Sequence, residues 1–294
     1  MRSFTSALLA ALAGATHVTA HSFVSNINID RLSYNGFHPP TPNSDPLAVG
    51  WSTTAFDQGY VNQTGYQTPD IICHRGAANA KAHARVAAGD TIHIQWNGWP
   101  QSHKGPVIDY LASCGDAGCE AVDKNALRLF KISEAGLIDG AEAPGTWATD
   151  QLIANNNSWV VEVPPQLRPG FYVLRTEIIA LHNASHAIGA QNYPQCVNLQ
   201  VEGGGTVLPS GGLPGQALYD PDDESMHLDI YAGVSTYRIP GPTVIAAAAA
   251  ETVALSHPVP TGTGTVYTGT AASTASATST AVSRARRQKR DMRA

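Results

Sequence analysis

His21 could provide more ligand atoms than an internal histidine, because it directly follows a segment typical of a cleaved leader. Val18-Thr19-Ala20 offers small residues that signal peptidase accepts, so cleavage after Ala20 would make His21 the first residue of the mature chain. Its α-amino group, with a pKa of roughly 7.7–8.0, and its imidazole would then provide two nitrogen ligands near neutral pH. One further imidazole would complete a three-nitrogen site, a donor set that favours Cu(II) over Zn(II).

Candidates for the remaining functional groups lie in two later segments. The segment "WPQSHKGPV" places His103 on a loop that leads into a strand. The segment "EIIALHNASHAIGAQNYPQC" places His182, Gln191 and Tyr193 in one strand–loop–strand unit. The other histidines considered show no matching pattern and are expected to be structural or solvent-exposed: His74, His83, His93, His186 and His227.

Residues 1–20 are predicted to be a secretory signal. Arg2 supplies the positive start, and residues 7–13 form an apolar core too short to span a bilayer. No later segment reaches the roughly 18 consecutive apolar residues of a membrane span; "VIAAAAAETVAL" is interrupted by Glu251. The sequence therefore predicts a secreted, extracellular protein that does not bind a membrane.

An oxidising compartment changes the interpretation of the four cysteines. Two disulfides are the default for an even set of cysteines outside the cell. Three pairings are possible for Cys73, Cys114, Cys119 and Cys196, although the short "GDAG" turn makes a local loop between Cys114 and Cys119 plausible. Zinc ligation is the competing interpretation, but the spacings do not form paired knuckles.

The charge of the chain indicates which partners it avoids. The full sequence has 18 Lys+Arg and 23 Asp+Glu, and residues 21–243 hold nearly twice as many acidic as basic side chains. Such a domain is a poor ligand for nucleic acid or an anionic membrane. A neutral polymer is an easier partner, although acidity could equally serve only solubility.

Short alternating runs predict an all-β domain over residues 21–243. "DTIHIQW" and "CVNLQV" alternate apolar and polar residues, "SWVVEV" and "FYVLRTEIIAL" are further strand candidates, and Pro- and Gly-rich turns separate them. Many short strands with long loops favour a two-sheet antiparallel β-sandwich.

The composition changes after residue 243. The Ser/Thr/Ala-rich segment up to the basic end "RARRQKRDMRA" is predicted to be a disordered tail over residues 244–294, dispensable for folding. Lys289-Arg290 resembles a dibasic processing site. N-glycosylation sequons occur at Asn62, Asn156 and Asn183.

The ordered set of these motifs resembles the fungal lytic polysaccharide monooxygenases of auxiliary activity family 9, which were formerly classed as endoglucanases. Segments that look like family sequence are "WSTTAFDQGYVNQTGYQTPDIICHRGA", "EIIALH", "GAQNYPQC" and "YRIPGP", and the resemblance runs from His21 to about Pro242. It implies an immunoglobulin-like or fibronectin-like sandwich with long loops. It also implies the pairings Cys73–Cys196 and Cys114–Cys119.

The resemblance also implies a role for each site residue. His21 and His103 would form a histidine brace that holds one copper ion per chain, with Tyr193 as the axial group. His182 and Gln191 would hydrogen-bond oxygen species at the metal, and Tyr237 would stack on a glucosyl ring. The first loop, "SYNGFHPPTPNSDPL", departs from the family pattern by becoming proline-rich, so the binding face is expected to have fewer aromatic rings.

The implied reaction is oxidative cleavage of cellulose or a related β-1,4-glucan at C1, C4 or both. It would need an external reductant and O2 or H2O2, and the enzyme is expected to act as a monomer. Two alternatives stay open: a non-catalytic secreted copper-binding protein, and a hydrolytic endo-β-1,4-glucanase. Hydrolysis requires two positioned carboxylates, and nothing in the spacing of Asp109 and Glu177 marks a pair.

Overall fold

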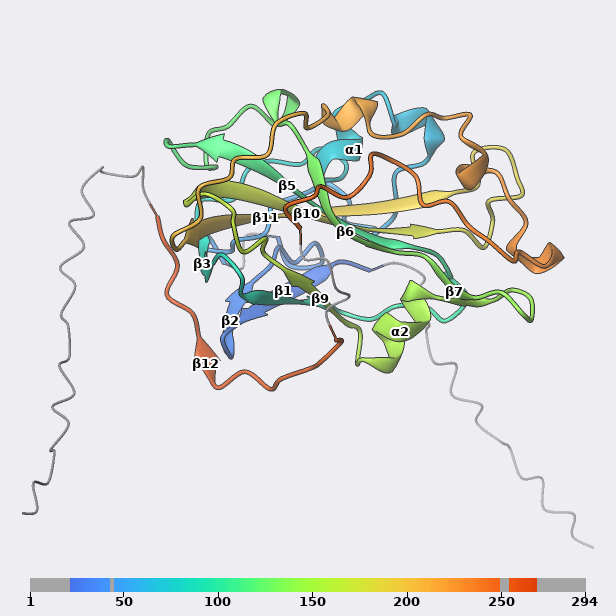
Figure 1. The fold of residues 1–294 in the computed structure, drawn as a ribbon, viewed down its shortest axis with the longest axis horizontal. Helices are drawn as coiled ribbons and strands as arrows, with labels where there is room; N and C mark the ends of the chain where they lie inside the picture. The colour runs from blue at the N-terminus through green and yellow to red at the C-terminus, as the bar shows by residue number, and fades with distance from the viewer. Residues whose placement is uncertain (1–21, 43–44, 249–253, 269–294) are drawn as a thin grey trace, which may run out of the picture.

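A computed structural model describes residues 22–42, 45–248 and 254–268, and shows a β-sandwich (Figure 1). The first sheet has the order β12-β2-β1-β4-β9 and the second has the order β3-β11-β10-β5-β6. The strands of the first sheet are β1 (Val24–Ile29), β2 (Leu32–Asn35), β4 (Thr91–Trp96), β9 (Ser158–Glu162) and β12 (Gly262–Thr263). Those of the second are β3 (Ala84–Ala87), β5 (Val107–Gly115), β6 (Phe130–Ala135), β10 (Gly170–Ala180) and β11 (Gln191–Glu202). The predicted fold class is confirmed.

Short elements fill the long connections between these strands. A small two-stranded sheet pairs β7 (Leu137–Asp139) with β8 (Thr146–Trp147). Two short helices are α1 (Asp70–Cys73) and α2 (Ala148–Ala154). Single 3₁₀ turns cover residues 63–65, 124–126, 215–217, 224–226 and 230–232. No helix in the described ranges is long and apolar enough to cross a membrane.

The second sheet is buried on both of its faces. Along β5, Val107 and Leu111 point into the core between the two sheets, whereas Ile108 and Tyr110 belong to a second core on the opposite face. Since side chains alternate along a strand, both sets of positions must be apolar or internally paired. This explains why "FYVLRTEIIA" in β10 is buried almost throughout.

Both disulfides implied by the resemblance are present. Cys73–Cys196 joins the end of α1 to the middle of β11, across a separation of 123 residues. Cys114–Cys119 closes the small loop after β5. The Cys73–Cys196 bond therefore joins the loops that cover the second core to β11, the strand that carries Gln191 and Tyr193.

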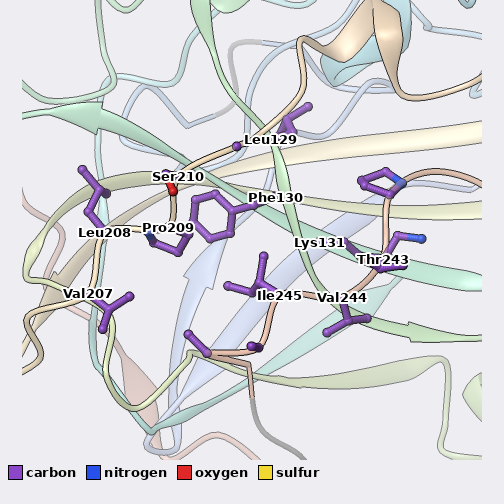
Figure 2. Close-up of a pocket in the computed structure, with 14 residues that line it drawn as sticks. Leu129, Phe130, Lys131, Val207, Leu208, Pro209, Ser210, Thr243, Val244 and Ile245 are labelled. Carbon is purple, nitrogen blue, oxygen red and sulfur yellow. The ribbon is translucent and has the colours of Figure 1, made fainter.

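Residues 244–248 and 254–268 lie on the sandwich, which differs from the predicted tail. Ile245 N donates to Lys131 O at 2.9 Å, and Figure 2 shows Ile245 beside Phe130 in a groove of about 640 Å³ between β6 and residues 207–211. Residues 254–268, here called the strap, then cross the first sheet. β12 pairs with β2, and Tyr267 exchanges two backbone hydrogen bonds with His83. The rest of the predicted tail and the predicted signal lie outside the described residues.

Deleting residues 254–294 is therefore expected to lower the melting temperature of the copper-loaded protein. The deletion removes the β12 pairing and exposes the rings of Tyr34 and Phe171, which contact the strap. A loss of about 2 kcal/mol, or roughly 4–8 °C for a domain of this size, follows from the hydrogen bonds and apolar area lost. Thermal melts check this result. A deletion of residues 269–294 alone is the control and should leave the melting temperature unchanged.

Asp109 is an acidic side chain in the core between the sheets. It is fully buried on β5, where Trp159 Nε1 donates to Oδ2 at 3.1 Å and Thr176 lies directly opposite on β10. Burial raises the pKa of this carboxyl to about 7. The folded protein therefore keeps Asp109 protonated at mildly acidic pH.

The free energy of unfolding is expected to fall as the pH rises from the pKa of Asp109 in the unfolded chain to its higher pKa in the folded protein. The stabilisation from the raised pKa is complete below the unfolded value of 3.8 and is lost as the pH rises to about 7. Buried His74, whose pKa is lowered to about 4, has the opposite effect between about 4 and 6.5. Asp109→Asn should therefore stabilise the protein at pH 8, by up to about 3 kcal/mol relative to its effect at pH 5. Melts at both pH values test this, and the exposed Asp116→Asn is the control.

Candidate metal centre

One hairpin carries three of the predicted site residues. β10 and β11 pair antiparallel, with Ala180 opposite Gln191 and Ile178 opposite Tyr193. His182 follows the end of β10, and the connecting turn lies at the right-hand end of the sandwich in Figure 1. The pairing thus brings His182, Gln191 and Tyr193 to the same end of the second sheet.

A second loop brings His103 to that end. His103 N donates to Pro100 O at 2.9 Å, and Trp99 Nε1 donates to His103 O at 2.8 Å, so the turn is closed by its own residues. Leu181 N donates to Lys104 O at 2.8 Å, which ties the loop to the residue before His182. Lys104 also forms an ion pair with Asp150 at the start of α2, at 2.7 Å.

The two histidine rings are in direct contact. His103 and His182 stack with their ring centroids 3.9 Å apart and an angle of 28° between the planes. Ser102 Oγ lies 3.1 Å from His103 Nδ1. His182 Nδ1 is buried with no hydrogen-bond partner among the described residues, and burial lowers the pKa of this imidazole. One nitrogen of His182 therefore remains available for a hydrogen bond.

Tyr193 and Gln191 form a buried pair beside these rings. Tyr193 Oη donates to Gln191 Oε1 at 3.0 Å, and the Tyr193 ring meets the Trp99 ring edge-on at 5.0 Å. Burial raises the pKa of the Tyr193 hydroxyl well above its usual value. The phenol is therefore neutral, and it could approach a metal only as a weak oxygen donor.

The chain enters the domain beside the same loop. Phe23 N and Ser22 Oγ both donate to Asn97 Oδ1, at 2.9 and 2.8 Å. Asn97 lies six residues before His103, so it links the residue after His21 to the loop that carries His103. His21 itself lies outside the described residues. Asn97 was missed by the sequence analysis; its only signal was a polar residue between the strand "TIHIQW" and the turn "GWP".

The donors present suit a nitrogen-coordinated metal. Among the residues that the structure describes, no three His, Cys, Asp or Glu side chains come together at one point. A metal ion at His103 would therefore need further ligands from outside these residues, and an N-terminal amine and imidazole at His21 would supply two. Such a set fits Cu(II) better than a hard cation, which prefers carboxylate and carbonyl oxygens.

The other histidines have local roles or are exposed. His74 is buried, contacts Gly59 O through Nε2 and accepts from Arg75 N through Nδ1. His83 Nε2 accepts from Cys119 N at 2.9 Å, and His93 Nδ1 contacts Ser256 O in the strap. His186 and His227 lie on exposed turns. These placements agree with the expectation for the five residues.

Tyr237 is partly buried. Its hydroxyl donates to Ser225 O at 3.2 Å, and its ring packs edge-on against the buried Trp147 at 5.0 Å. The exposed ring of this segment is that of Tyr231, with an exposed fraction of 55%. Stacking of Tyr237 on a glucosyl ring stays a prediction.

The chain is similar in sequence to known proteins. The family model described as Auxiliary Activity family 9 (formerly GH61) matches residues 21–237. The chain is 51% identical to AA9 family lytic polysaccharide monooxygenase D of Podospora anserina, over 85% of this chain and 73% of that protein. It is 54% identical to AA9 family lytic polysaccharide monooxygenase A of Thermoascus aurantiacus, over 76% of this chain and 98% of that protein.

Solved structures show the same fold. The extended catalytic domain of H. jecorina LPMO9A has a TM-score of 0.79 and 46% identity, and the match covers 84% of this chain and all of that one. A polysaccharide monooxygenase from M. thermophila, described as cellulose-active, has a TM-score of 0.67 and 30% identity, over 76% of this chain and 99% of that one.

Proposed function

Because the chain belongs to Auxiliary Activity family 9, a family of copper-dependent lytic polysaccharide monooxygenases, we propose that it is a secreted enzyme that cleaves β-1,4-glucan oxidatively. The substrate is cellulose or a related glucan, attacked at C1, C4 or both. The co-substrates are an external reductant and O2 or H2O2. The observation that carries this proposal is the stacking of His103 on His182 beside the Tyr193–Gln191 pair, next to the point where the mature chain would begin.

His103 and the N-terminal nitrogens of His21 would hold one copper ion, with the Tyr193 hydroxyl as a weak oxygen donor beside it. Copper, when bound, supplies the one-electron chemistry that the polypeptide lacks. The chain's own contribution is geometric. Trp99 and Pro100 fix the backbone of His103, and the Leu181–Lys104 bond holds His182 against it. Gln191 and His182 would hydrogen-bond the oxygen co-substrate.

The buried carboxylates argue against hydrolysis. A glycoside hydrolase needs two carboxyl groups on either side of the scissile bond. Asp109 and Glu177, the two acidic residues considered for this role, are both fully buried, and Glu177 is paired with Arg175. Neither can reach a glucan chain in solvent.

The relative from M. thermophila is described as cellulose-active, which supports cellulose as the first substrate to test.

Mass spectrometry of the products from cellulose tests the proposal. With ascorbate and copper, we expect oxidised oligosaccharides; without ascorbate, or after removal of copper by EDTA, we expect none. Unoxidised products that form without a reductant would support the hydrolase. Tight copper binding without any product would support the non-catalytic alternative.

Peptide mass analysis of the secreted protein should also find His21 as the first residue, and an active preparation that retains a preceding residue would refute the brace.

Gln191→Ala is expected to retain copper and to lose most oxidative turnover. Removal of one preorganised hydrogen-bonding group at a reacting centre costs about 100-fold in rate. His182→Ala should behave similarly, because its proposed contact is with the co-substrate. Product yield with H2O2, measured at equal copper loading, checks both variants. Gln200→Ala, on the same strand but opposite Phe171 at its other end, is the control and should keep the native yield.

A further inference from the structure

The turn between β10 and β11 carries a glycosylation sequon beside the candidate copper site. Asn183-Ala184-Ser185 directly follows His182, and both Asn183 and Ser185 are exposed. Consecutive backbone hydrogen bonds close the turn, from Ala184 N to Leu181 O and from His186 N to Asn183 O. A Cβ at Gly189 would lie 1.8 Å from Asn183 O, so the turn is tight and holds Asn183 in place.

Asn183 differs from the other two sequon asparagines in the state of its side chain. Asn62 Oδ1 accepts hydrogen bonds from Thr64 N and Thr64 Oγ1. Asn156 Nδ2 contacts His257 Nε2 of the strap at 3.0 Å. The Asn183 side chain is exposed and has no hydrogen bond to the residues that the structure describes. Its amide is therefore free to carry a substituent without the loss of a native contact.

We propose that Asn183 carries an N-linked glycan that borders the copper-binding face and hinders docking on flat crystalline cellulose, while isolated glucan chains still reach the site. The effect on docking rests on the proposed function. His182 stacks on His103, the proposed copper ligand, and adjacent Cα atoms are about 3.8 Å apart, so the glycan begins on the residue next to one whose ring contacts that ligand. A branched, hydrated oligosaccharide there occupies space that an extended flat surface would need. A single chain can pass beside it.

The modification itself is an oligosaccharyl transfer in the secretory pathway. A bond forms between Asn183 Nδ2 and C1 of the first sugar, while the bond from C1 to the phosphate of a lipid-linked donor breaks. The amide loses one proton and the lipid diphosphate leaves. Ser185 supplies the hydroxyl that the sequon requires.

Glycopeptide analysis of the full chain secreted from a filamentous fungal host tests the modification. Enzymatic deglycosylation in ¹⁸O-labelled water should convert Asn183 to ¹⁸O-labelled aspartate. Ser185→Thr keeps the sequon and should keep the label, whereas Ser185→Ala and Asn183→Gln should abolish it. An unlabelled Asn183 in the native chain would overturn the proposal.

Binding to microcrystalline cellulose tests the effect of the glycan. Asn183→Gln and enzymatically deglycosylated native protein should both bind several-fold more, and Ser185→Thr should bind like the native protein. Turnover of soluble cello-oligosaccharides should be unchanged. Asn156→Gln removes a different sequon and is the control. Unchanged cellulose binding of Asn183→Gln and of the deglycosylated protein would overturn the steric role. Failure of the proposed function shows separately, as a lack of oxidised products from the native protein on both substrates.

Discussion

Replacing His103 with alanine is expected to lower the affinity for Cu(II) by more than about 100-fold, because one of three proposed nitrogen ligands is lost. The amine and imidazole of His21 would still chelate the ion, but through two nitrogens only. Affinity for a divalent metal depends strongly on the number of donors that the fold holds in place. Trp99, Pro100 and Leu181 hold the His103 loop through backbone contacts that the substitution leaves intact.

Calorimetric titration of Cu(II) into the metal-free protein measures this effect. His186→Ala is the matched control, since His186 lies on the exposed turn four residues beyond His182. Its dissociation constant should equal that of the native protein. An unchanged constant for His103→Ala, or a weakened one for His186→Ala, would mean that the second imidazole ligand was wrongly identified. Thermal melts without metal should show that both variants fold.

The hairpin of the site could be predicted because its signals are local. Alternation in "CVNLQV", the apolar run before His182 and the glycine-containing turn are all contained in one segment. The contact between His103 and His182 was not visible in this way. It depends on the Leu181–Lys104 hydrogen bond between segments far apart in the chain, and only the resemblance to a family placed the two residues in one site.

The strap was not predicted because amino-acid composition indicates what side chains can contribute to stability and says nothing about backbone hydrogen bonds. "TGTGT" offers little apolar area, so its ordering appeared too costly. Thr261 N and Gly264 N nevertheless donate to Arg31 O and Ser33 O, and these bonds use backbone groups that almost any sequence provides. The exposed edge of β2 is what makes the pairing favourable.

Replacing Glu177 with alanine is expected to lower the free energy of unfolding by about 3–5 kcal/mol, because it leaves a buried guanidinium without its counter-ion. Arg175 and Glu177 are both fully buried on the outer face of β10, and two hydrogen bonds of 2.8 and 2.9 Å join them. Arg175 also donates to Ile71 O and Ile72 O at the end of α1. Its position is therefore fixed, so the guanidinium cannot turn to water when the carboxylate is removed.

The same substitution should loosen the metal centre. Asn192 Nδ2 donates to Glu177 Oε1 at 2.9 Å, and Asn192 is the residue between Gln191 and Tyr193. Tyr219 donates a short hydrogen bond to the other carboxylate oxygen. Loss of Glu177 thus releases contacts that hold β11 where it carries the two site residues. We expect lower oxidative turnover even at temperatures where the variant is folded.

Thermal melts of matched variants separate this buried pair from an ordinary ion pair. Arg85–Glu202 is an exposed pair on the same sheet, so Glu202→Ala should cost less than about 1 kcal/mol. Glu177→Ala should lower the melting temperature by roughly 6–20 °C. The double variant Arg175→Met, Glu177→Leu removes both charges and should recover much of the loss, since apolar pairs often replace buried ion pairs without cost. A loss for Glu177→Ala no larger than that for Glu202→Ala would show that Arg175 finds another partner.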